Sequence, residues 1–350
     1  NFGQQVRFII PRKGDLVRKI YFRFTLPILR DRSSPGSTLV WTDSIGHALI
    51  EYVDLYIGRT LIDRIDTQLL EVYSDMFSDQ EKQIGLKDLI GKGTYNHITS
   101  FPSRFGNNSE TPDYNRNNEF IVELPFYFNR NSSLALPLVS LTLQEIELVF
   151  KLRTAEELIV NNLPGSTSSA NPIWDPETTG PMKILKAELL VDYVYLGDKE
   201  IEHFKTHPVN QIITQHQLAT VIAREGESVK RIRTDFTNPV KEFFFVVQQT
   251  NRLPIDLTYK EGNDYFNFTL DNANKVSGNT LHSITGIQLD LDGHTLMDDD
   301  ICDGMFLAIQ QPMNFHTRIP DRLIYVYSNA LDPENSKPSG SINMSRVMHQ

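Results

Sequence analysis

Two stretches of the chain carry residue types that bind phosphate or metal in other proteins. Residues Gly85–Thr94 are glycine-rich and include Lys92, as phosphate-binding loops do. However, five residues rather than four separate Gly85 from Gly91, and Gly93 follows the lysine where a serine or threonine is needed. His203 and His207 have the i, i+4 spacing of a zinc-binding helix, but no glutamate follows the first histidine. We therefore predict a solvent-facing histidine pair and no phosphate loop.

Acidic and thiol groups elsewhere do not form a recognisable site either. The run Asp298–Asp300 lacks the spaced ligands and closing glutamate of a calcium loop, so we predict a solvated turn. Cys302 has no papain-like or caspase-like neighbours, and we predict a small buried side chain. The paired carboxylates of a glycosidase are defined by their separation in space, so the sequence leaves them open. With no positive sign of catalysis, we expect no enzyme activity, no cofactor and no bound metal.

The elements that hold these residues are mainly strands, because apolar and polar residues alternate with a period of two. The pattern is clearest from Leu16 to Leu26, and it recurs at residues 146–152, 185–193 and 287–292. Turn residues such as glycine, asparagine and aspartate separate these segments. Helical spacing is sparse and is best developed in Thr67–Gly91. This distribution predicts an all-β protein: a sandwich, barrel or jelly roll, with short helices in loops.

A segment rich in Asn, Pro, Gly, Ser and Thr divides the chain into two halves of similar length. We predict a first domain over residues 1–160, a linker over 161–182 and a second domain over 183–350. The six residues Gly58–Asp63 are echoed by Gly293–Asp298 in the second half. This echo and the matching strand content favour two similar sandwich domains in tandem.

Composition and charge exclude several classes of protein. The 350 residues are 40% hydrophobic and 22% charged, which is typical of a globular protein with a large core and unlike a disordered chain. The net charge of −10 has the wrong sign for direct binding to nucleic acid. No apolar run approaches the roughly 18 residues of a transmembrane helix. A single cysteine excludes an intramolecular disulfide, so the fold must hold without one.

One segment carries a more specific signal. The sequence Leu124-Pro125-Phe126-Tyr127-Phe128-Asn129-Arg130, followed by Leu134-Ala135-Leu136-Pro137-Leu138, resembles the major capsid proteins of the nucleocytoplasmic large DNA viruses. Similar landmarks follow in order along the chain at Gly14, Asp15, Gly58, Asp63, Leu124, Pro125, Phe126, Phe128, Leu136, Pro137, Asn238, Pro239, Gly293, His316, Pro320, Tyr327, Pro338, Ser339, Gly340 and Arg346. Family members often differ at Arg59, Leu143, Gln144 and Met344.

The resemblance implies a fold and a role. The fold is a double jelly roll, two tandem eight-stranded antiparallel sandwiches, and three chains assemble into a homotrimer with a pseudo-hexagonal outline. Such capsomers tile the icosahedral capsid of a large double-stranded DNA virus, outside an internal membrane, with minor capsid and penton proteins as further partners. The resemblance also implies assembly in the host cytoplasm. Members usually carry a further N-terminal segment before the point where this chain begins, so we expect part of the first sheet to be missing.

Some features fit other interpretations. Asn107, Asn131 and Asn267 lie in Asn-x-Ser/Thr sequons and are candidates for glycosylation, whereas we expect a structural role for Asn343. A jelly-roll hydrolase or cupin-like metal enzyme would need clustered histidine and glutamate ligands. A glycan-binding lectin would need Trp41 or Trp174 to stack on sugar. The polar loops Gly91–Asn118 and Asn161–Gly180 are candidates for the outer surface or for contacts within the trimer.

Overall fold

The computed structural model describes residues 1–27, 39–92, 118–161, 182–224, 226–227, 229–250, 263–269 and 282–347. Contacts within the chain define two compact units. The first unit comprises Asn1–Ser74, Gln80–Gln215 and Gln248–Asn267, and the second comprises Asp75–Asp79, His216–Val247 and Phe268–Gln350.

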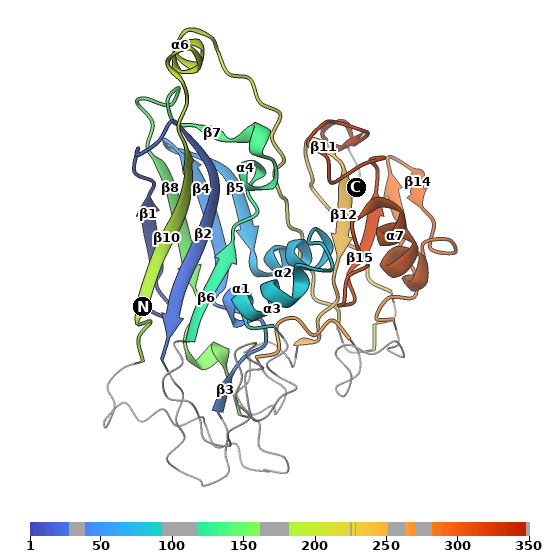
Figure 1. Ribbon diagram of the computed structural model, residues 1–350. Coiled ribbons are helices and arrows are strands. Elements are labelled where there is room, and N and C mark those ends of the chain that lie inside the picture. Colours follow the sequence, from blue (N-terminus) through green and yellow to red (C-terminus); the bar gives the residue numbers. More distant parts are fainter. Residues whose placement is uncertain are drawn as a thin grey trace. The chain divides into compact units, whose positions relative to one another are not determined.

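The first unit contains an eight-stranded sandwich built from two four-stranded antiparallel sheets (Figure 1). One sheet has the order β1-β8-β4-β5, with bounds Gln5–Ile9, Ile146–Leu152, Ile50–Ile57 and Thr60–Asp66. The other has the order β10-β2-β6, with β7 also paired to β2, and its bounds are Lys186–Val194, Leu16–Leu26, Asn118–Glu123 and Leu136–Pro137. A further pair joins β3 and β9, Leu39–Trp41 and Ile159–Asn161.

The apolar faces of the two sheets meet in an aromatic core. Ile20, Phe22 and Phe24 of β2 are fully buried at every second position, as the alternating sequence predicts. The ring centroid of Phe22 lies 4.6 Å from that of Phe150 in β8, and Phe8 of β1 packs edge-on against both rings. Contact between the two sheets therefore depends on a few large rings.

Short helices close the first unit around the sandwich. Their bounds are Ile45–Ala48 (α1), Thr67–Met76 (α2), Gln83–Ile90 (α3), Tyr127–Arg130 (α4) and Asp198–Thr206 (α6), with 3₁₀ turns at Ser132–Leu134 (η2) and Glu156–Leu158 (η3). The helical spacing seen in Thr67–Gly91 is thus confirmed as two helices, α2 and α3. The last two residues of α2, Asp75 and Met76, are grouped with the second unit.

The second unit has three antiparallel strand pairs among its described residues. They are β11 with β16, β12 with β15 and β13 with β14, with bounds Pro239–Val240, Ile342–Asn343, Glu242–Phe245, Tyr325–Ser328, Leu289–Leu291 and His294–Met297. A π-helical stretch, η5 (Phe306–Gln310), leads into α7 (Gln311–Phe315), and a 3₁₀ turn, η6 (Met344–Arg346), follows β16. Met297, Cys302, Leu307 and Tyr325 form its core cluster.

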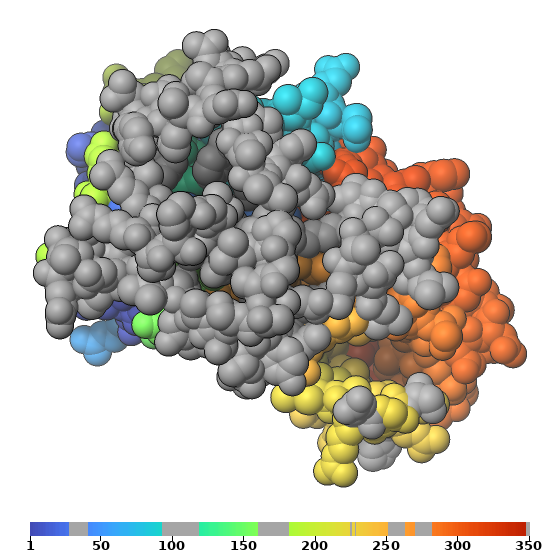
Figure 2. All heavy atoms as spheres, turned by 90° about the horizontal axis from the view of Figure 1, so that it is seen from below, coloured from blue at the N-terminus to red at the C-terminus, as the bar shows by residue number. Residues whose placement is uncertain are grey.

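The described residues between 216 and 237 of the second unit, all but 225 and 228, form a segment without helix or strand, which we call the exposed arm. Gln217 receives a hydrogen bond from the backbone N–H of Thr237 (2.9 Å) and donates one to its carbonyl (2.7 Å), which ties the two ends together. Figure 2 shows part of this segment, in yellow, projecting from the surface. Leu218, Ile222 and Val229 are 66–73% exposed. The arm therefore presents apolar side chains to solvent.

The units differ from the predicted domains in where residues 183–215 belong. Strand β10 pairs with β2 from Lys186↔Thr25 to Val194↔Leu16, so contacts place it in the first unit. The expected linker over 161–182 lies almost entirely outside the described residues. Division into domains at these boundaries therefore stays a prediction.

Candidate functional site

The segment that carries the family resemblance is anchored to β2. Asn129, 4% exposed, receives a hydrogen bond from the backbone N–H of Ile20 (3.2 Å) and donates one to its carbonyl (3.0 Å). The side-chain amide of Asn129 thus makes the two hydrogen bonds to the backbone of Ile20 that a neighbouring strand would otherwise make. Leu124, Phe126 and Phe128 are fully buried, and the last two rings stack with centroids 5.9 Å apart. The segment is a structural clamp rather than an accessible site.

Replacing Asn129 with leucine should destabilise the first unit. Leucine keeps most of the volume but removes both hydrogen bonds to Ile20, which leaves a buried N–H without its acceptor. We expect a loss of about 1–3 kcal/mol in the free energy of unfolding, measured by urea titration. The exposed Asn210→Leu is the matched control, and an equal effect from both changes would contradict the clamp.

Gly14, Asp15, Leu136 and Pro137 meet at the start of β2. Leu136 and Pro137 form β7 and pair with Val17 and Leu16. The Asp15 carboxylate accepts the backbone N–H of Leu196 at 2.9 Å. A Cβ atom at Gly14 would lie 2.7 Å from Cβ of Tyr193, so only glycine fits here without a shift. These predicted residues are therefore brought together in one junction.

The echoed sequences both form tight hairpins, one in each unit. Gly58 has φ 64° and lies between β4 and β5, while Gly293 has φ 82° and follows Asp292 (φ 49°) between β13 and β14. Both hairpins need positive φ, which explains the glycines. The echo is offset by one residue, because Gly58 is the first loop residue and Gly293 is the second. Asp63 of β5 is buried, at 3% exposed.

Several of the remaining landmarks lie at or near β11 and β16 of the second unit. Pro239 pairs with Asn343, and the backbone N–H of Asn238 donates to Ser345 Oγ at 2.7 Å. Asn343 caps η6 by accepting the N–H of Ser345, in line with its expected structural role. Ser339 is fixed to Asp332, and a Cβ at Gly340 would lie 2.7 Å from a backbone oxygen. Pro338 and Arg346 are exposed, Pro320 is buried, and Tyr327 pairs with Phe243.

His316 lies between two glutamates in the second unit. Its Nε2 is 3.3 Å from Glu242, its Nδ1 is 3.3 Å from Glu334, and its side chain is fully buried. The rings of Phe77 and Phe244 pack against it. Burial disfavours the charged imidazolium, but the hydrogen bonds and negative charges of the two glutamates outweigh it and raise the pKa of His316 to about 9.

This pKa predicts a pH dependence of stability. Since the folded-state value lies above the ordinary 6.5, the contribution is complete below pH 6.5 and is lost as the pH rises to about 9. The pKa of Glu334 is lowered despite burial, by His316 and Thr317, so its contribution is lost as the pH falls below 4.5. His316→Gln should therefore destabilise the protein by about 1.5–3 kcal/mol near pH 5.5 and much less at pH 9.5. Urea unfolding at both pH values tests this, with the exposed His294→Gln as control; equal losses at both would refute it.

A buried charge cluster in the first unit escaped the sequence analysis. Glu71 of α2 is fully buried; its carboxylate lies 2.6 Å from Nδ1 of His47 and 3.2 Å from Nζ of Lys92, and it accepts a hydrogen bond from Ser44. The side chains of His47 and Lys92 are 3% and 8% exposed. Ser44 donates to the glutamate rather than to the histidine, so this is not a catalytic triad.

The structure describes four features that the sequence raised as candidate sites. His203 and His207 are exposed with their rings stacked 4.4 Å apart, and Asp298–Asp300 form an exposed turn. Gly91 (φ 73°) caps the C-terminus of α3, so the Gly85–Lys92 stretch is helix and cap. Cys302 is 3% exposed, and burial raises the pKa of its thiol. Among the described residues, no three His, Cys, Asp or Glu side chains are grouped to hold a metal.

The glycan-related predictions fare differently. Asn267 is 3% exposed and its amide donates to Asp264 at 3.0 Å, so the expectation that it tolerates a glycan is wrong. The side-chain oxygen of Asn131 caps η2 by accepting the backbone N–H of Ser133, and this side chain remains partly exposed. Trp41, 4% exposed, stacks on Phe2 and cannot offer its face to a sugar. Asn107, Trp174 and most of the two long polar loops lie outside the described residues.

Comparison with known proteins identifies the family of this chain. Residues 1–197 match the family model described as the major capsid protein N-terminus, and residues 200–350 match that of the large eukaryotic DNA virus major capsid protein. The chain belongs to this capsid protein family. It is 26% identical to the major capsid protein of Trichoplusia ni ascovirus 2c, covering 98% of the chain and 72% of the relative. It is also 26% identical to that of Phaeocystis pouchetii virus, covering 99% and 82%.

Solved structures show the same fold. A chain of the PBCV-1 virus capsid superimposes with a TM-score of 0.73 at 22% identity, covering 99% of this chain and 79% of that one. The Faustovirus major capsid protein gives 0.72 at 13% identity, covering 99% and 82%. This capsid protein is thus a double jelly roll with a structural role in the virion capsid. The family is one of structural proteins, so the enzyme alternatives are set aside.

Proposed function

We propose that this capsid protein forms homotrimers with a pseudo-hexagonal outline, which tile an icosahedral shell. Two similar sandwiches in each chain give a trimer six similar lobes, so hexagonal packing arises from closed threefold symmetry. The observation that carries the proposal is family membership over both halves of the chain. Residues of the predicted motif then hold each lobe in shape rather than contact a ligand.

The exposed arm supports an assembling role. Its side chains Leu218, Ile222, Val229 and Ile232 are 49–73% exposed within one segment of the second unit. Clustered apolar residues on a protein surface mark sites of association. Burying them against another subunit provides a driving force for assembly that the isolated chain does not use.

The partners and location follow from the same proposal. Neighbouring capsomers and minor capsid and penton proteins are the expected contacts, in a shell that assembles in the host cytoplasm outside an internal membrane. The net charge of −10 favours a shell protein that does not bind the genome directly. Within the described residues, no helix is long and apolar enough to cross a bilayer.

Light scattering behind size exclusion tests the trimer. At micromolar concentration we expect a stable species near three times 40.1 kDa. A species that remains monomeric at every concentration would refute the trimer for this chain. Ile222→Asp in the exposed arm should shift the distribution toward monomer, whereas Leu331→Asp, at a residue that is also exposed, serves as control.

A further inference from the structure

The first unit has a groove of about 490 Å³ beside the C-terminal end of α6. Its apolar wall includes Ile57, Leu136, Leu141 and Phe204, which come from three separate parts of the chain. Neighbouring backbone is held in place, because Ser140 Oγ donates to the Phe204 carbonyl (2.9 Å) and Gln211 Nε2 donates to the Ala135 carbonyl (3.3 Å). These bonds hold the walls of an open groove whose lining is part apolar and part polar.

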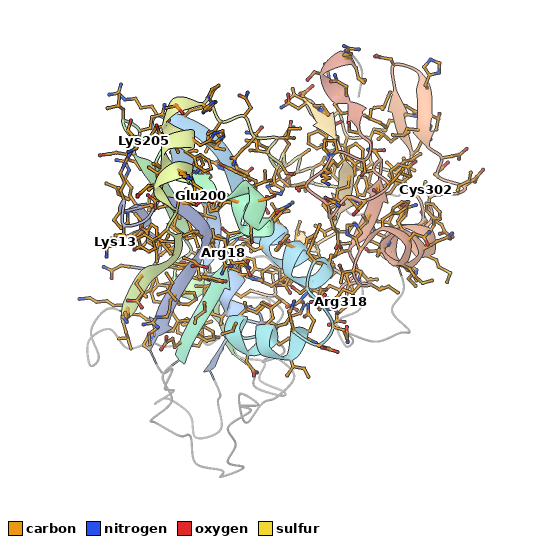
Figure 3. All side chains as sticks on the ribbon, turned by 45° about the horizontal axis from the view of Figure 1, so that its top comes forward. Lys13, Arg18, Glu200, Lys205, Cys302 and Arg318 are labelled. Atoms are coloured by element: carbon orange, nitrogen blue, oxygen red, sulfur yellow. The ribbon has the colours of Figure 1, made fainter. Side chains whose placement is uncertain are left out.

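The groove contains one positively charged side chain, Lys205, in a chain with a net charge of −10. His207 also lines it, and none of the described lining residues is a carboxylate. Figure 3 shows Lys205 on α6. Burial raises the pKa of the lining residue Tyr127 to about 12, so it adds no negative charge. An occupant with an apolar anchor next to carboxylates would match this lining.

The chain itself carries such an element in the second unit. The turn Asp298–Ile301 exposes the carboxylates of Asp299 and Asp300 next to Ile301, whose side chain is 64% exposed. The turn is ordered in advance: the Asp298 carboxylate accepts the N–H of Asp300 (3.2 Å) and its carbonyl accepts the N–H groups of Ile301 (3.1 Å) and Cys302 (2.7 Å). Cys302 then anchors the turn in the core. A turn fixed in this way loses little entropy on binding.

We propose that the Asp298–Ile301 turn of one copy docks in this groove of a neighbouring copy. Ile301 fills the apolar part, and Asp299 and Asp300 face Lys205 and His207. The contact joins two different surfaces, the second unit of one copy and the first unit of the next, and such head-to-tail contacts generate a closed ring when the rotation between neighbouring copies closes, as threefold symmetry requires. The proposal rests on the trimer proposed above, for which it supplies a specific contact between subunits.

A charge exchange tests the contact on the full chain. Lys205→Glu and Asp299→Lys should each raise the concentration at which the trimer half-dissociates by at least about tenfold, because like charges then face each other at every interface. Combining both changes in one chain exchanges the charges of residues 205 and 299. The concentration at which the trimer half-dissociates should then return to within about threefold of that of the unchanged protein. Ile301→Ser should weaken the trimer without being rescued. Lys199→Glu on the same helix and Leu331→Ser are the matched controls.

The outcomes separate this contact from the trimer itself. If the unchanged protein is trimeric but the two charge variants associate as tightly as the controls do, the contact is refuted while the trimer stands. The same holds if both variants weaken the trimer and the double variant gives no rescue. If the unchanged protein does not associate, both the proposed trimer and this contact are refuted. Circular dichroism and melting temperature verify that each variant is folded, as expected for exposed side chains.

Discussion

Replacing Phe22 with alanine should lower the free energy of unfolding by about 3–5 kcal/mol. Phe22 is fully buried in β2 and its ring packs against Phe8, Phe24 and Phe150, so its removal leaves a cavity between the two sheets. The rigid strands on both sides limit how far that cavity can collapse. Urea unfolding followed by circular dichroism measures the loss.

Thr25→Ala is the matched control for this change. Thr25 lies in the same strand, on the opposite face and only partly buried, and we expect it to change stability by less than about 1 kcal/mol. Similar losses at both positions would contradict the assignment of the core to one face of β2.

Glu71→Gln should also destabilise the first unit, by about 3–5 kcal/mol. The change removes the negative charge that faces His47 and Lys92 in an environment almost closed to water. Removing one member of a buried charge cluster is expensive because the remaining charge is poorly solvated. The same urea titration measures this loss.

A second substitution distinguishes charge from packing at Glu71. The double variant Glu71→Gln with Lys92→Met leaves no ammonium to be compensated. Its loss of stability should therefore be smaller than the sum of the losses of the two single variants. Purely additive losses would show that the ion pair does not carry the effect. Glu81→Gln, which alters an exposed carboxylate nearby in sequence, should be close to neutral.

How far the sequence predicts the fold depends on how local the signal is. Residues 16–26 and 146–152 alternate with a period of two and form β2 and β8 with those bounds, because one face of each strand is buried. The alternation within a strand does not indicate which other strand it pairs with. Strand β10 alternates equally well, but only the three-dimensional pairing with β2 shows that it completes the first sandwich.

Polar groups in the interior were harder to predict. Glu71 lies between Leu70 and Val72 on a helix, and its position alone does not distinguish an exposed carboxylate from one paired with His47, which is 24 residues away. Asn129 stands in a quoted motif, but its bond to a strand more than a hundred residues away has no local signature. Asn267 satisfied the rule for glycosylation, and only burial excluded it. Such roles are set by distant contacts.

The return of β10 to the first sandwich has a consequence for synthesis on the ribosome. Strand β2 is made early, but its partner from Lys186 to Val194 emerges about 160 residues later. Until then the nascent chain exposes one long edge of β2, with unpaired backbone groups that attract other strands. A nascent chain halted before residue 186 should therefore depend on chaperones, and release of the first sandwich from them should coincide with the emergence of β10 rather than with the end of the first 160 residues.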